Sequence, residues 1–484
     1  MSQRNNSTSS ALAAGRSQSE SSESTFTVLS PVDGLPAASF LAFSVDDALA
    51  TAARAAKAQT DWANLPFPER RRMLLNAADI LEREHEDVAR AFARETGATS
   101  DWAAMNVHEA AETLREAAGL TSTPTGQRLP GQDGSTNILS EREPAGVVLA
   151  IVPWNAPLVL AARSIAIALA LGNAVLLRPS ELAPQTAGAV IVDALHRAGV
   201  PADVVSCIST RPGDGRSVIS ALLDNSAVNR VVFIGSTPVG QKIAERAANR
   251  MIPGVFELGG KNATVIREDA DLDEWIPKLA LACFANSGQV CMCTERIIVH
   301  HSLRDELVRK LSDFANEMTV GDPAKVDTDL GPVIDDAAAE RFDGYMVDAV
   351  EHGAQVTAGG LRDGRYVRPT VLTDVPTAAK VRFQETFLPL VHVTEFETDA
   401  EAIALANEGQ FGLIASVVSK DEAAAVSLAR QIRAGAVHVN GPSVGDEPHV
   451  PFGGLGLSGA GRLGGEESVR FFTTQRTYYI HNSK

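Results

Sequence analysis

Hydrophobic and polar positions recur with a helical period in the first part of this chain. Between Val45 and Leu120 the apolar residues return about every three or four positions, and the run is interrupted once, around Pro66 and Pro68. This spacing is typical of amphipathic helices, and proline is common in the first turn of a helix. The segment therefore predicts successive helices. Residues 121–140, which follow, are rich in Gly, Pro, Thr and Ser and predict an extended excursion.

A different pattern begins at Glu143, where short apolar runs alternate with longer helical segments as far as Asn249. The runs at 147–152 and 231–234 have the length of buried strands, and the apolar stretch at 158–171 has the length of a helix. A second alternating series extends from 254 to about 439. Such alternation predicts an α/β fold with doubly wound parallel sheets.

The charge of the chain indicates the kind of partner that it binds. It carries 60 acidic and 43 basic side chains, a formal net charge of −17 that repels nucleic acid and anionic membranes. With 45% hydrophobic and 21% charged residues, its 484 residues can bury more than one core. We expect a small-molecule ligand, with no nucleic-acid and no membrane partner.

The amino-terminal segment, residues 1–25, differs from the rest. It is dense in serine and asparagine and poor in bulky apolar residues, and it is predicted to be a disordered tail. It lacks the apolar stretch of a signal peptide, and no apolar run elsewhere has the length of a membrane helix. Because the few cysteines also lack a secreted-domain pattern, we expect a cytoplasmic protein with free thiols.

One of the four cysteines, Cys207, Cys283, Cys291 and Cys293, is a candidate nucleophile. Cys291 lies among small and polar residues, 34 positions after Glu257. A thiolate attacks an electrophilic carbonyl, and a nearby carboxylate accepts a proton from the thiol or from water. The alternative is a buried structural cysteine and a helix-capping glutamate. No second ligand pair or histidine cluster accompanies Cys291 and Cys293, so no metal is predicted.

Two turns that follow predicted strands add candidate binding groups. The amide of Asn155 can donate hydrogen bonds to a developing oxyanion, and the alternative is a turn-forming role. The run Gly235 to Gly240 joins a strand to a helix predicted over 241–249, an arrangement that suits a phosphate or pyrophosphate. Gln241 stands where a P-loop requires lysine, so nucleotide hydrolysis is not supported.

Six motifs in a fixed order resemble those of the aldehyde dehydrogenase superfamily, and the resemblance covers about residues 27–480. The motifs are Pro153–Asn155, Arg178–Glu181, Gly235–Thr237, Glu257–Asn262, Gly288–Cys291 and Pro451–Gly454. This resemblance implies an aldehyde dehydrogenase-like fold, in which a Rossmann-type NAD-binding domain is joined to an α/β catalytic domain and a small β oligomerisation arm.

The resemblance also implies domain boundaries and an oligomer. The apolar run at 476–480 reads as an edge strand of the arm, and such an arm implies a homodimer or homotetramer. The expected boundaries are 26–120 and 141–253 for the NAD-binding domain, 254–439 for the catalytic domain, and 121–140 and 466–484 for the arm, with 440–465 returning to the NAD-binding side.

The resemblance implies a reaction in which an aldehyde is oxidised to a carboxylic acid. Cys291 is implied to add to the aldehyde, giving a thiohemiacetal and then, after hydride transfer to a nicotinamide, a thioester. The amide of Asn155 and the backbone N–H of Cys291 are implied to hold the oxyanion. Glu257 is implied to deprotonate the water that hydrolyses the thioester.

Cofactor binding is implied for a set of residues spread over several motifs. Glu181 can accept from both ribose hydroxyls and repels a 2′-phosphate, which favours NAD over NADP. Arg178 departs from the usual lysine of the family, and its guanidinium could admit a 2′-phosphate, so NADP stays possible. Leu388 replaces the usual glycine beside Phe387. The implied cofactor residues are Trp154, Arg178, Ser180, Glu181, Gly235, Ser236, Gly240, Leu258, Glu385 and Phe387.

The runs around Cys291 and at 446–449 resemble the branch that oxidises benzaldehyde, vanillin and salicylaldehyde. Trp102 and Arg163 match positions near the substrate tunnel of that branch, where indole stacks on a ring and guanidinium contacts a ring substituent. Their structural alternatives are interhelix packing for Trp102 and a buried ion pair for Arg163. Functional alternatives are an aliphatic, terpenoid or semialdehyde dehydrogenase, a cysteine hydrolase and a non-catalytic binding protein.

Overall fold

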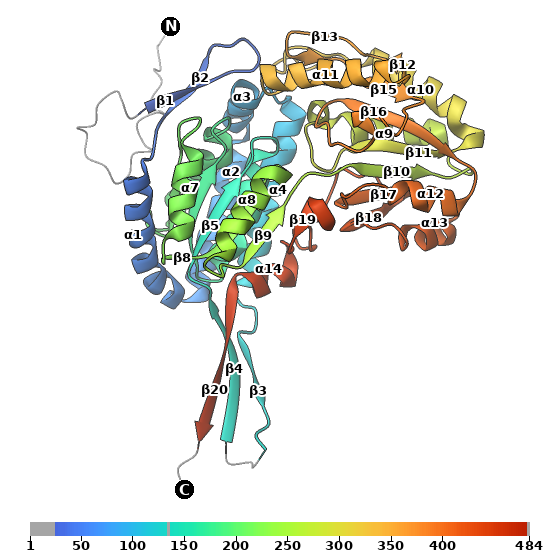
Figure 1. Ribbon diagram of the computed structural model, residues 1–484. Coiled ribbons are helices and arrows are strands. Elements are labelled where there is room, and N and C mark those ends of the chain that lie inside the picture. The colour runs from blue at the N-terminus through green and yellow to red at the C-terminus, as the bar shows by residue number, and fades with distance from the viewer. Residues whose placement is uncertain (1–24, 133–135, 482–484) are drawn as a thin grey trace.

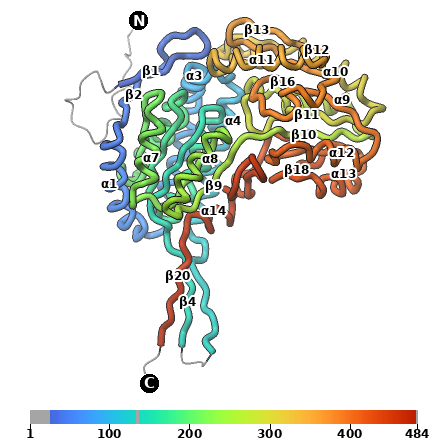
Figure 2. The backbone as a smooth tube through the Cα atoms, viewed as in Figure 1, coloured from blue at the N-terminus to red at the C-terminus, as the bar shows by residue number. Residues whose placement is uncertain are grey.

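The computed structural model describes residues 25–132 and 136–481, so the predicted tail over 1–24 lies outside the described residues. The chain forms two α/β lobes and a narrow arm (Figure 1). The backbone trace shows the arm projecting from the first lobe, away from both sheets (Figure 2).

Four helices precede the first sheet, as the periodicity predicts. Helix α1 begins at a capping box, in which the side chains of Ser44 and Asp47 each accept from the other's backbone N–H. It ends at the predicted proline break, and Pro68 lies in the first turn of α2. Gly97 ends α3 in the left-handed conformation, with φ of 71°. The helices are α1 (Val45–Asn64), α2 (Phe67–Arg83), α3 (His85–Thr96) and α4 (Ser100–Leu120), after a hairpin of β1 (Thr25–Leu29) and β2 (Pro36–Leu41).

A six-stranded sheet in the order β19-β9-β8-β5-β6-β7 forms the first lobe, and every strand except β19 is parallel to its neighbours. Every residue of β5 is buried, because helices cover both faces of the sheet. The strands are β5 (Val147–Val152), β6 (Ala174–Pro179), β7 (Val205–Cys207), β8 (Val228–Ile234), β9 (Gly254–Glu257) and β19 (Gly459–Ala460). The helices are α5 (Pro157–Ala170), a π-helical segment η2 (Gln185–Ala189), α6 (Val190–Arg197), α7 (Gly215–Asp224) and α8 (Thr237–Ala248).

Two predicted boundaries in this lobe are wrong. Residues 254–257, expected to open the catalytic domain, form β9, and β9 pairs with β8 so that Glu257 lies beside Ile234. Strand pairing, which the run of apolar residues does not reveal, therefore places Glu257 on the first sheet. Helix α8 begins at Thr237 and not at 241, because proline fits the first turn of a helix, where its missing N–H is not needed.

The second lobe contains a seven-stranded sheet in the order β12-β15-β16-β11-β10-β17-β18, in which only β12 is antiparallel. The strands are β10 (Asn262–Ile266), β11 (Thr294–His300), β12 (Gln355–Ala358), β15 (Thr370–Thr373), β16 (Leu390–Phe396), β17 (Ile414–Val418) and β18 (Ala436–Val439), with a small hairpin of β13 (Arg362–Asp363) and β14 (Tyr366–Val367). The helices are α9 (Leu272–Phe284), α10 (Arg304–Glu317), α11 (Asp336–Glu351), α12 (Asp399–Ala406) and α13 (Glu422–Ala429), with 3-10 turns η3 (Ala285–Gly288), η4 (His301–Leu303), η5 (Lys380–Arg382) and η6 (Gly456–Ser458).

The arm is a three-stranded antiparallel sheet in the order β20-β4-β3, with the predicted edge strand on its outside. Its bounds differ from the expected ones. Strand β4 continues to Pro144, and the region from 465 begins as a helix that packs on the first lobe, so the strand starts only at Thr473. The elements are β3 (Gly126–Leu129), β4 (Thr136–Pro144), α14 (Gly465–Phe471) and β20 (Thr473–His481).

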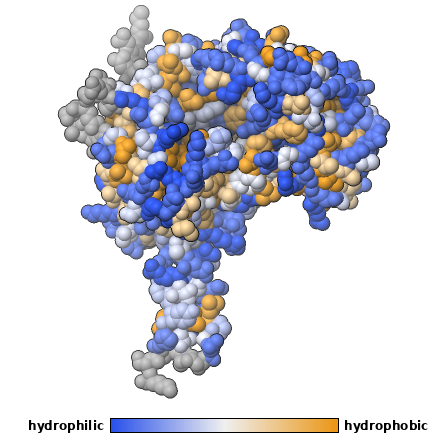
Figure 3. Space-filling model, viewed as in Figure 1, coloured by the Kyte–Doolittle hydropathy of each residue, from blue (hydrophilic) through white to orange (hydrophobic). Residues whose placement is uncertain are grey.

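Hydrophilic side chains cover most of the face shown in Figure 3, and hydrophobic side chains gather in small groups, one of them on the arm. Leu129, Tyr479 and Ile480 are exposed arm residues of this kind. Within residues 25–132 and 136–481, every helix is too short or too polar to span a bilayer.

Candidate active site

The loop that follows α9, residues 285–293, carries Cys291 and has an unusual backbone. Asn286, Ser287 and Gly288 are consecutive left-handed residues, with φ of 49°, 58° and 72°. Such a conformation typically costs about 1–3 kcal/mol at a non-glycine residue, so neighbouring contacts must hold it. The amide of Asn286 donates to the carbonyl of Asn155 at 3.0 Å, and the hydroxyl of Ser287 donates to the carbonyl of Gly331 at 2.8 Å.

Gly288 is required by space as well as by conformation. A Cβ at this position would lie 2.0 Å from the carbonyl oxygen of Leu388, far inside van der Waals contact. The loop of Cys291 and the loop of Leu388 therefore meet backbone to backbone. Leu388, which stands where the family usually has glycine, lies directly at this contact.

Asn262, at the start of β10, fixes the backbone on either side of the candidate nucleophile. Its side-chain amide donates to the carbonyl of Cys291 at 2.7 Å and to that of Cys293 at 2.9 Å. The sequence placed Asn262 in a family motif but did not predict its contact with the cysteine loop, because no spacing links residue 262 to residue 291. Its role here is to hold the cysteine loop against the second sheet.

The thiol of Cys291 is half-buried, and its surroundings keep it protonated. Burial and the charges of Glu257, Glu385 and Asp446 raise the pKa of the Cys291 thiol to about 12, and the guanidinium of Arg163 opposes this rise. A thiol with such a pKa needs a nearby base or additional positive charge to act as a thiolate.

Asn155 lies in the turn between β5 and α5 and reaches the cysteine loop, as predicted. Its side-chain amide is buried and donates to the carbonyl of Gln289 at 2.9 Å. Gln289 is held in turn, because its side-chain oxygen accepts from the backbone N–H of Ile334 at 2.9 Å. An asparagine amide carries two N–H donors, so one remains for a ligand oxygen near Cys291.

Glu257 ends β9 as a buried carboxyl group, 3% exposed, and its Oε1 has no hydrogen-bond partner in the described chain. Burial raises the pKa of Glu257 to about 8; the charge of Asp446 adds to the rise, and Arg163 and Arg462 oppose it. The charge of Glu257 is in turn one of the causes that raise the pKa of the Cys291 thiol. An unpartnered acceptor of this kind is available to a water molecule.

Arg163 is a buried ion-pair partner, which was its structural alternative. Its guanidinium pairs with Asp446 and lies over the ring of Phe452, 5.5 Å from the ring centre. Phe452 packs in the same apolar cluster as Cys291 and Met292. The sequence reasoning missed Asp446 as a contact of Arg163, because the two positions share no motif or period.

Trp102, on α4, packs against two apolar clusters, and its stacking on a substrate ring stays a prediction. It packs against the core of the first lobe and also against Val290, Cys293 and Met292 beside the nucleophile. Its indole N–H donates to the carbonyl of Asn155 at 2.9 Å. The indole therefore supports the turn that carries Asn155 while it forms an apolar wall near Cys291.

The turn between β8 and α8 leaves donors at the start of a 12-residue helix. Ser236 is the N-cap residue, and its hydroxyl makes no capping hydrogen bond in the described chain, so it can donate to an anion. Pro238 has no N–H, and the N–H of Val239 donates to the carbonyl of Ser236 at 3.1 Å, which leaves the N–H of Thr237 as the further donor of this turn. Gly240 has a packing role inside the helix, because a Cβ there would lie 2.4 Å from the side chain of Leu258. Gly235 is likewise packed closely, against the ring of Phe233.

Arg178 and Glu181 form a pair at the end of β6. The guanidinium of Arg178 donates to Glu181 at 2.7 Å and to the hydroxyl of Thr210 at 2.9 Å, and its buried Nε has no partner in the described chain. The carboxylate of Glu181 is partly exposed. Ser180 accepts from the backbone N–H of Leu182 at 3.2 Å and so shapes the same turn.

Glu385 lies against the glycines that follow Glu257. It accepts from the backbone N–H of Gly260 at 2.9 Å, and a Cβ at Gly259 would lie 2.0 Å from its carboxylate. Burial and the charge of Glu295 raise the pKa of Glu385 to about 8. Because a carboxyl group of this kind is held by one hydrogen bond, it can turn towards a ligand at small cost.

Phe387 and Trp154 form an aromatic pair beside Glu385, with ring centres 5.8 Å apart and edge-to-face geometry. The buried pair of Lys261 and Glu295 supports the loop, since Glu295 also accepts from the backbone N–H of Phe387 at 3.0 Å. This support was missed in the sequence, because Lys261 and Glu295 are separate motif residues without a predicted contact.

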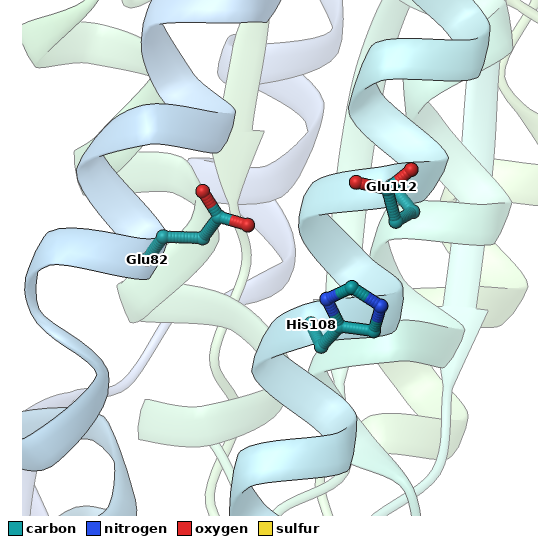
Figure 4. Close-up of side chains that lie close together, drawn as sticks. All are labelled: Glu82, His108 and Glu112. Carbon is teal, nitrogen blue, oxygen red and sulfur yellow. The ribbon is translucent and has the colours of Figure 1, made fainter.

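A group of Glu82, His108 and Glu112 on α2 and α4 offers ligand atoms within 4.8 Å of one another (Figure 4). Arg115 already binds both carboxylates, donating to Glu82 at 2.5 and 2.8 Å and to Glu112 at 2.8 Å. The group is therefore an ion-pair network around an arginine on the described surface, with His108 exposed beside it.

Comparison with known proteins decides the family. The model of the aldehyde dehydrogenase family matches residues 18–478, nearly the whole chain. The chain belongs to the aldehyde dehydrogenase family. It is an NAD(P)-dependent aldehyde oxidoreductase of α/β fold.

The aldehyde dehydrogenases most useful for comparison bear names of aromatic substrates. The chain is 40% identical to a vanillin dehydrogenase from a Pseudomonas species over 471 residues, 97% of each chain. It is 38% identical to a Pseudomonas putida enzyme named benzaldehyde dehydrogenase [NAD(+)] over 428 residues, 88% of this chain and 87% of the relative. A crystal structure of Pseudomonas putida salicylaldehyde dehydrogenase with salicylaldehyde matches with a TM-score of 0.93 and 34% identity, covering 96% of each chain.

Proposed function

We propose that this aldehyde dehydrogenase oxidises aromatic aldehydes to carboxylic acids with NAD, through a thioester on Cys291. The observation that carries the proposal is that segments of both lobes meet at the loop of Cys291. The amide of Asn155 donates to Gln289 in that loop, Asn262 holds the loop to the second sheet, and Gly260, three residues after Glu257, lies against the carbonyl of Cys291. This arrangement supports Cys291 as nucleophile, Glu257 as base and Asn155 as oxyanion donor.

The first step is addition of the Cys291 sulfur to the carbonyl carbon. The sulfur forms a C–S bond, the thiol proton leaves to a base, and the carbonyl oxygen becomes an oxyanion. The free N–H of Asn155 and the backbone N–H of Cys291 stabilise that oxyanion. When bound, NAD would supply the acceptor for the hydride that the thiohemiacetal carbon loses as it becomes a thioester.

Glu257 completes the reaction by accepting a proton from water, which attacks the thioester carbonyl. The C–S bond breaks, the carboxylic acid leaves and the thiol is restored. The unpartnered Oε1 of Glu257 is suited to this role, and a pKa of about 8 makes the carboxylate a stronger base than an exposed glutamate.

The apolar residues near Cys291 support an aromatic substrate. Trp102 and Val290 belong to one apolar cluster, Phe452 and Cys291 to another, and Met292 packs against both, while the Arg163 guanidinium lies over the ring of Phe452. Flat apolar surfaces of this kind favour a ring over a flexible chain, because stacking on them adds to the burial of apolar area. The relatives named for vanillin, benzaldehyde and salicylaldehyde support the same class.

The cofactor site fits a dinucleotide with a free 2′-hydroxyl. The Ser236 end of α8 suits the pyrophosphate, Glu181 suits the adenosine ribose, and Glu385 suits the nicotinamide ribose. Arg178 is engaged by Glu181 and Thr210, which leaves the negative charge of Glu181 partly neutralised but still unfavourable to a 2′-phosphate. We therefore propose NAD as the preferred cofactor, with NADP as the weaker one.

Formation of NADH or NADPH at 340 nm tests the proposal with benzaldehyde, vanillin, salicylaldehyde and hexanal. We expect turnover of the aromatic aldehydes with NAD, no turnover by Cys291→Ala, and unchanged activity in Cys207→Ala as the matched control. A large preference for hexanal would contradict the aromatic assignment, and strict dependence on coenzyme A would contradict hydrolysis.

We also propose that the arm joins copies of the chain into a homodimer or homotetramer. The support is its isolated sheet, with unpaired strand edges and exposed apolar side chains such as Tyr479 and Ile480. Light scattering on the full chain and on Tyr479→Lys/Ile480→Lys tests this. A wild-type protein that is monomeric at micromolar concentration would contradict it.

A further inference from the structure

A buried carboxylate outside the catalytic cluster lies in the last turn of α3. Glu95 is 1% exposed, and the reaction described above does not use it. Both of its oxygens are engaged: one accepts from the backbone N–H of Gln185 at 2.8 Å, and the other accepts from the N–H and the hydroxyl of Thr186 at 2.8 and 2.6 Å. No arginine or lysine of the described chain forms an ion pair with it.

The three donors belong to two adjacent residues at the start of η2, which continues directly into α6. The first N–H groups of a helix have no partner within the helix and need an acceptor. Pro184, the residue before η2, provides no side-chain cap. Glu95 supplies from another helix the acceptor that the local sequence lacks.

The segment held in this way is the end of a short loop, Ser180–Pro184, which we call the ribose loop. It begins where β6 ends, and it contains Glu181, the partner of Arg178. Within the loop the hydroxyl of Ser180 accepts from the backbone N–H of Leu182 and its carbonyl accepts from that of Ala183, and Glu181 accepts from Arg178 at 2.7 Å. The position of Glu181 thus depends on Arg178, on β6 at one end of the loop, and on the contacts of Glu95 just beyond the other end.

We propose that Glu95 is a positioning residue for the dinucleotide, holding the ribose loop so that Glu181 meets the adenosine ribose. The inference rests on the proposed placement of that ribose at Glu181. Loss of the Glu95 contacts would leave the chemistry at Cys291 intact, because no element of that cluster is anchored by Glu95. The expected defect is therefore in cofactor affinity.

The electrostatics of Glu95 separate this role from a purely structural one. Burial raises the pKa of Glu95 to about 7, although its three hydrogen bonds oppose the rise. Glutamine replaces one acceptor oxygen with an NH₂ group that cannot accept a hydrogen bond, so on a structural role alone Glu95→Gln lowers stability but leaves the cofactor affinity of the folded protein unchanged. A positioning role predicts weaker binding in a folded protein, since one backbone N–H then faces an NH₂ group.

The experiment measures the dissociation constant for NAD by calorimetry, together with kcat and the KM values for NAD and benzaldehyde. For Glu95→Gln we expect about a tenfold rise in the dissociation constant and KM of NAD, with kcat and the KM of benzaldehyde within about twofold of wild type. Thr186→Val removes only the hydroxyl contact and should give a smaller rise. Glu86→Gln, an exposed position on the same helix, is the matched control and should behave as wild type.

Glu181→Gln tests the underlying placement of the ribose. If Glu181→Gln weakens NAD binding and neither Glu95→Gln nor Thr186→Val does, the positioning role of Glu95 is overturned. If Glu181→Gln binds NAD as tightly as wild type, the proposed ribose placement fails, and any effect of Glu95→Gln no longer acts through Glu181. Should Glu95→Gln not fold, Thr186→Val alone decides: unchanged NAD binding overturns the inference.

Discussion

The pH dependence of thioester breakdown tests the role of Glu257 most sharply. With a pKa of about 8, roughly one Glu257 carboxyl in eleven is ionised at pH 7 and roughly ten in eleven at pH 9. If the carboxylate activates water, the hydrolysis rate should rise about tenfold between these two values. Glu257→Gln cannot accept the proton, so it should lose this rise and accumulate the acyl-enzyme.

The burial that raises the pKa also predicts an effect on stability. Raising the pKa from 4.5 to about 8 corresponds to about 5 kcal/mol in favour of the protonated form. Between pH 4.5 and pH 8 the Glu257 carboxyl of the folded chain retains a proton that the unfolded chain releases. The stability that protonated Glu257 contributes is therefore fully present below pH 4.5 and is lost as the pH rises to 8. The side chain of Glu257→Gln stays neutral at every pH. The free energy of unfolding of the variant, relative to that of wild type, should therefore increase with rising pH, by at most about 5 kcal/mol.

Stopped-flow mixing with benzaldehyde and NAD gives a burst of NADH and then the hydrolytic rate, and intact-protein mass spectrometry counts the acyl-enzyme. Urea unfolding at pH 5, 7 and 9 gives the stability difference. Glu245→Gln, exposed on α8, is the control and should match wild type in both assays. The reasoning about Glu257 is refuted if the wild-type hydrolytic rate is flat between pH 7 and 9, or if Glu257→Gln turns over at the wild-type rate.

Three further changes test other parts of the site. Asp446→Asn removes a negative charge that raises the pKa of Glu257, so the rising limb of the pH–rate profile should move to lower pH by up to about one unit, and a shift to higher pH would contradict this. Gly288→Ala adds a methyl group against the carbonyl of Leu388 at a positive φ, so thermal melting should show a loss of about 2 kcal/mol or more, with a reduced NADH burst. The control Gly344→Ala, inside α11 with no atom within 4 Å of the added methyl group, should melt at or slightly above the wild-type temperature. Glu181→Gln releases Arg178 and removes a charge that repels a 2′-phosphate, so the ratio of kcat/KM for NADP to that for NAD should rise at least about tenfold, and an unchanged ratio would argue against Glu181 as the determinant.

Periodicity predicted the helices and strands of this chain well where the bounds of an element depend on its own residues. Strand β5 spans the predicted apolar run, and the break between α1 and α2 falls at the predicted prolines, because burial and the missing proline N–H are local properties. The sheet to which β9 belongs was predicted wrongly, because pairing with β8 depends on residues far away in sequence.

The residues of the candidate site could be predicted from the sequence, but several of their contacts could not. Cys291, Glu257 and Asn155 could be proposed from the sequence because their chemistry and motif order are visible there. Asp446 beside Arg163, and Glu95 beneath Thr186, were not found as contacts, since each pair joins segments without a shared period or motif. Long-range burial of charge is a property of the folded chain, and only coordinates reveal it.

The proposed nucleophile and the proposed water-activating carboxylate belong to different sheets, with Cys291 held to β10 and Glu257 on β9. A change in the relative position of the two lobes would therefore change the distance between the sulfur and the carboxylate, and the rate of thioester hydrolysis would respond to it.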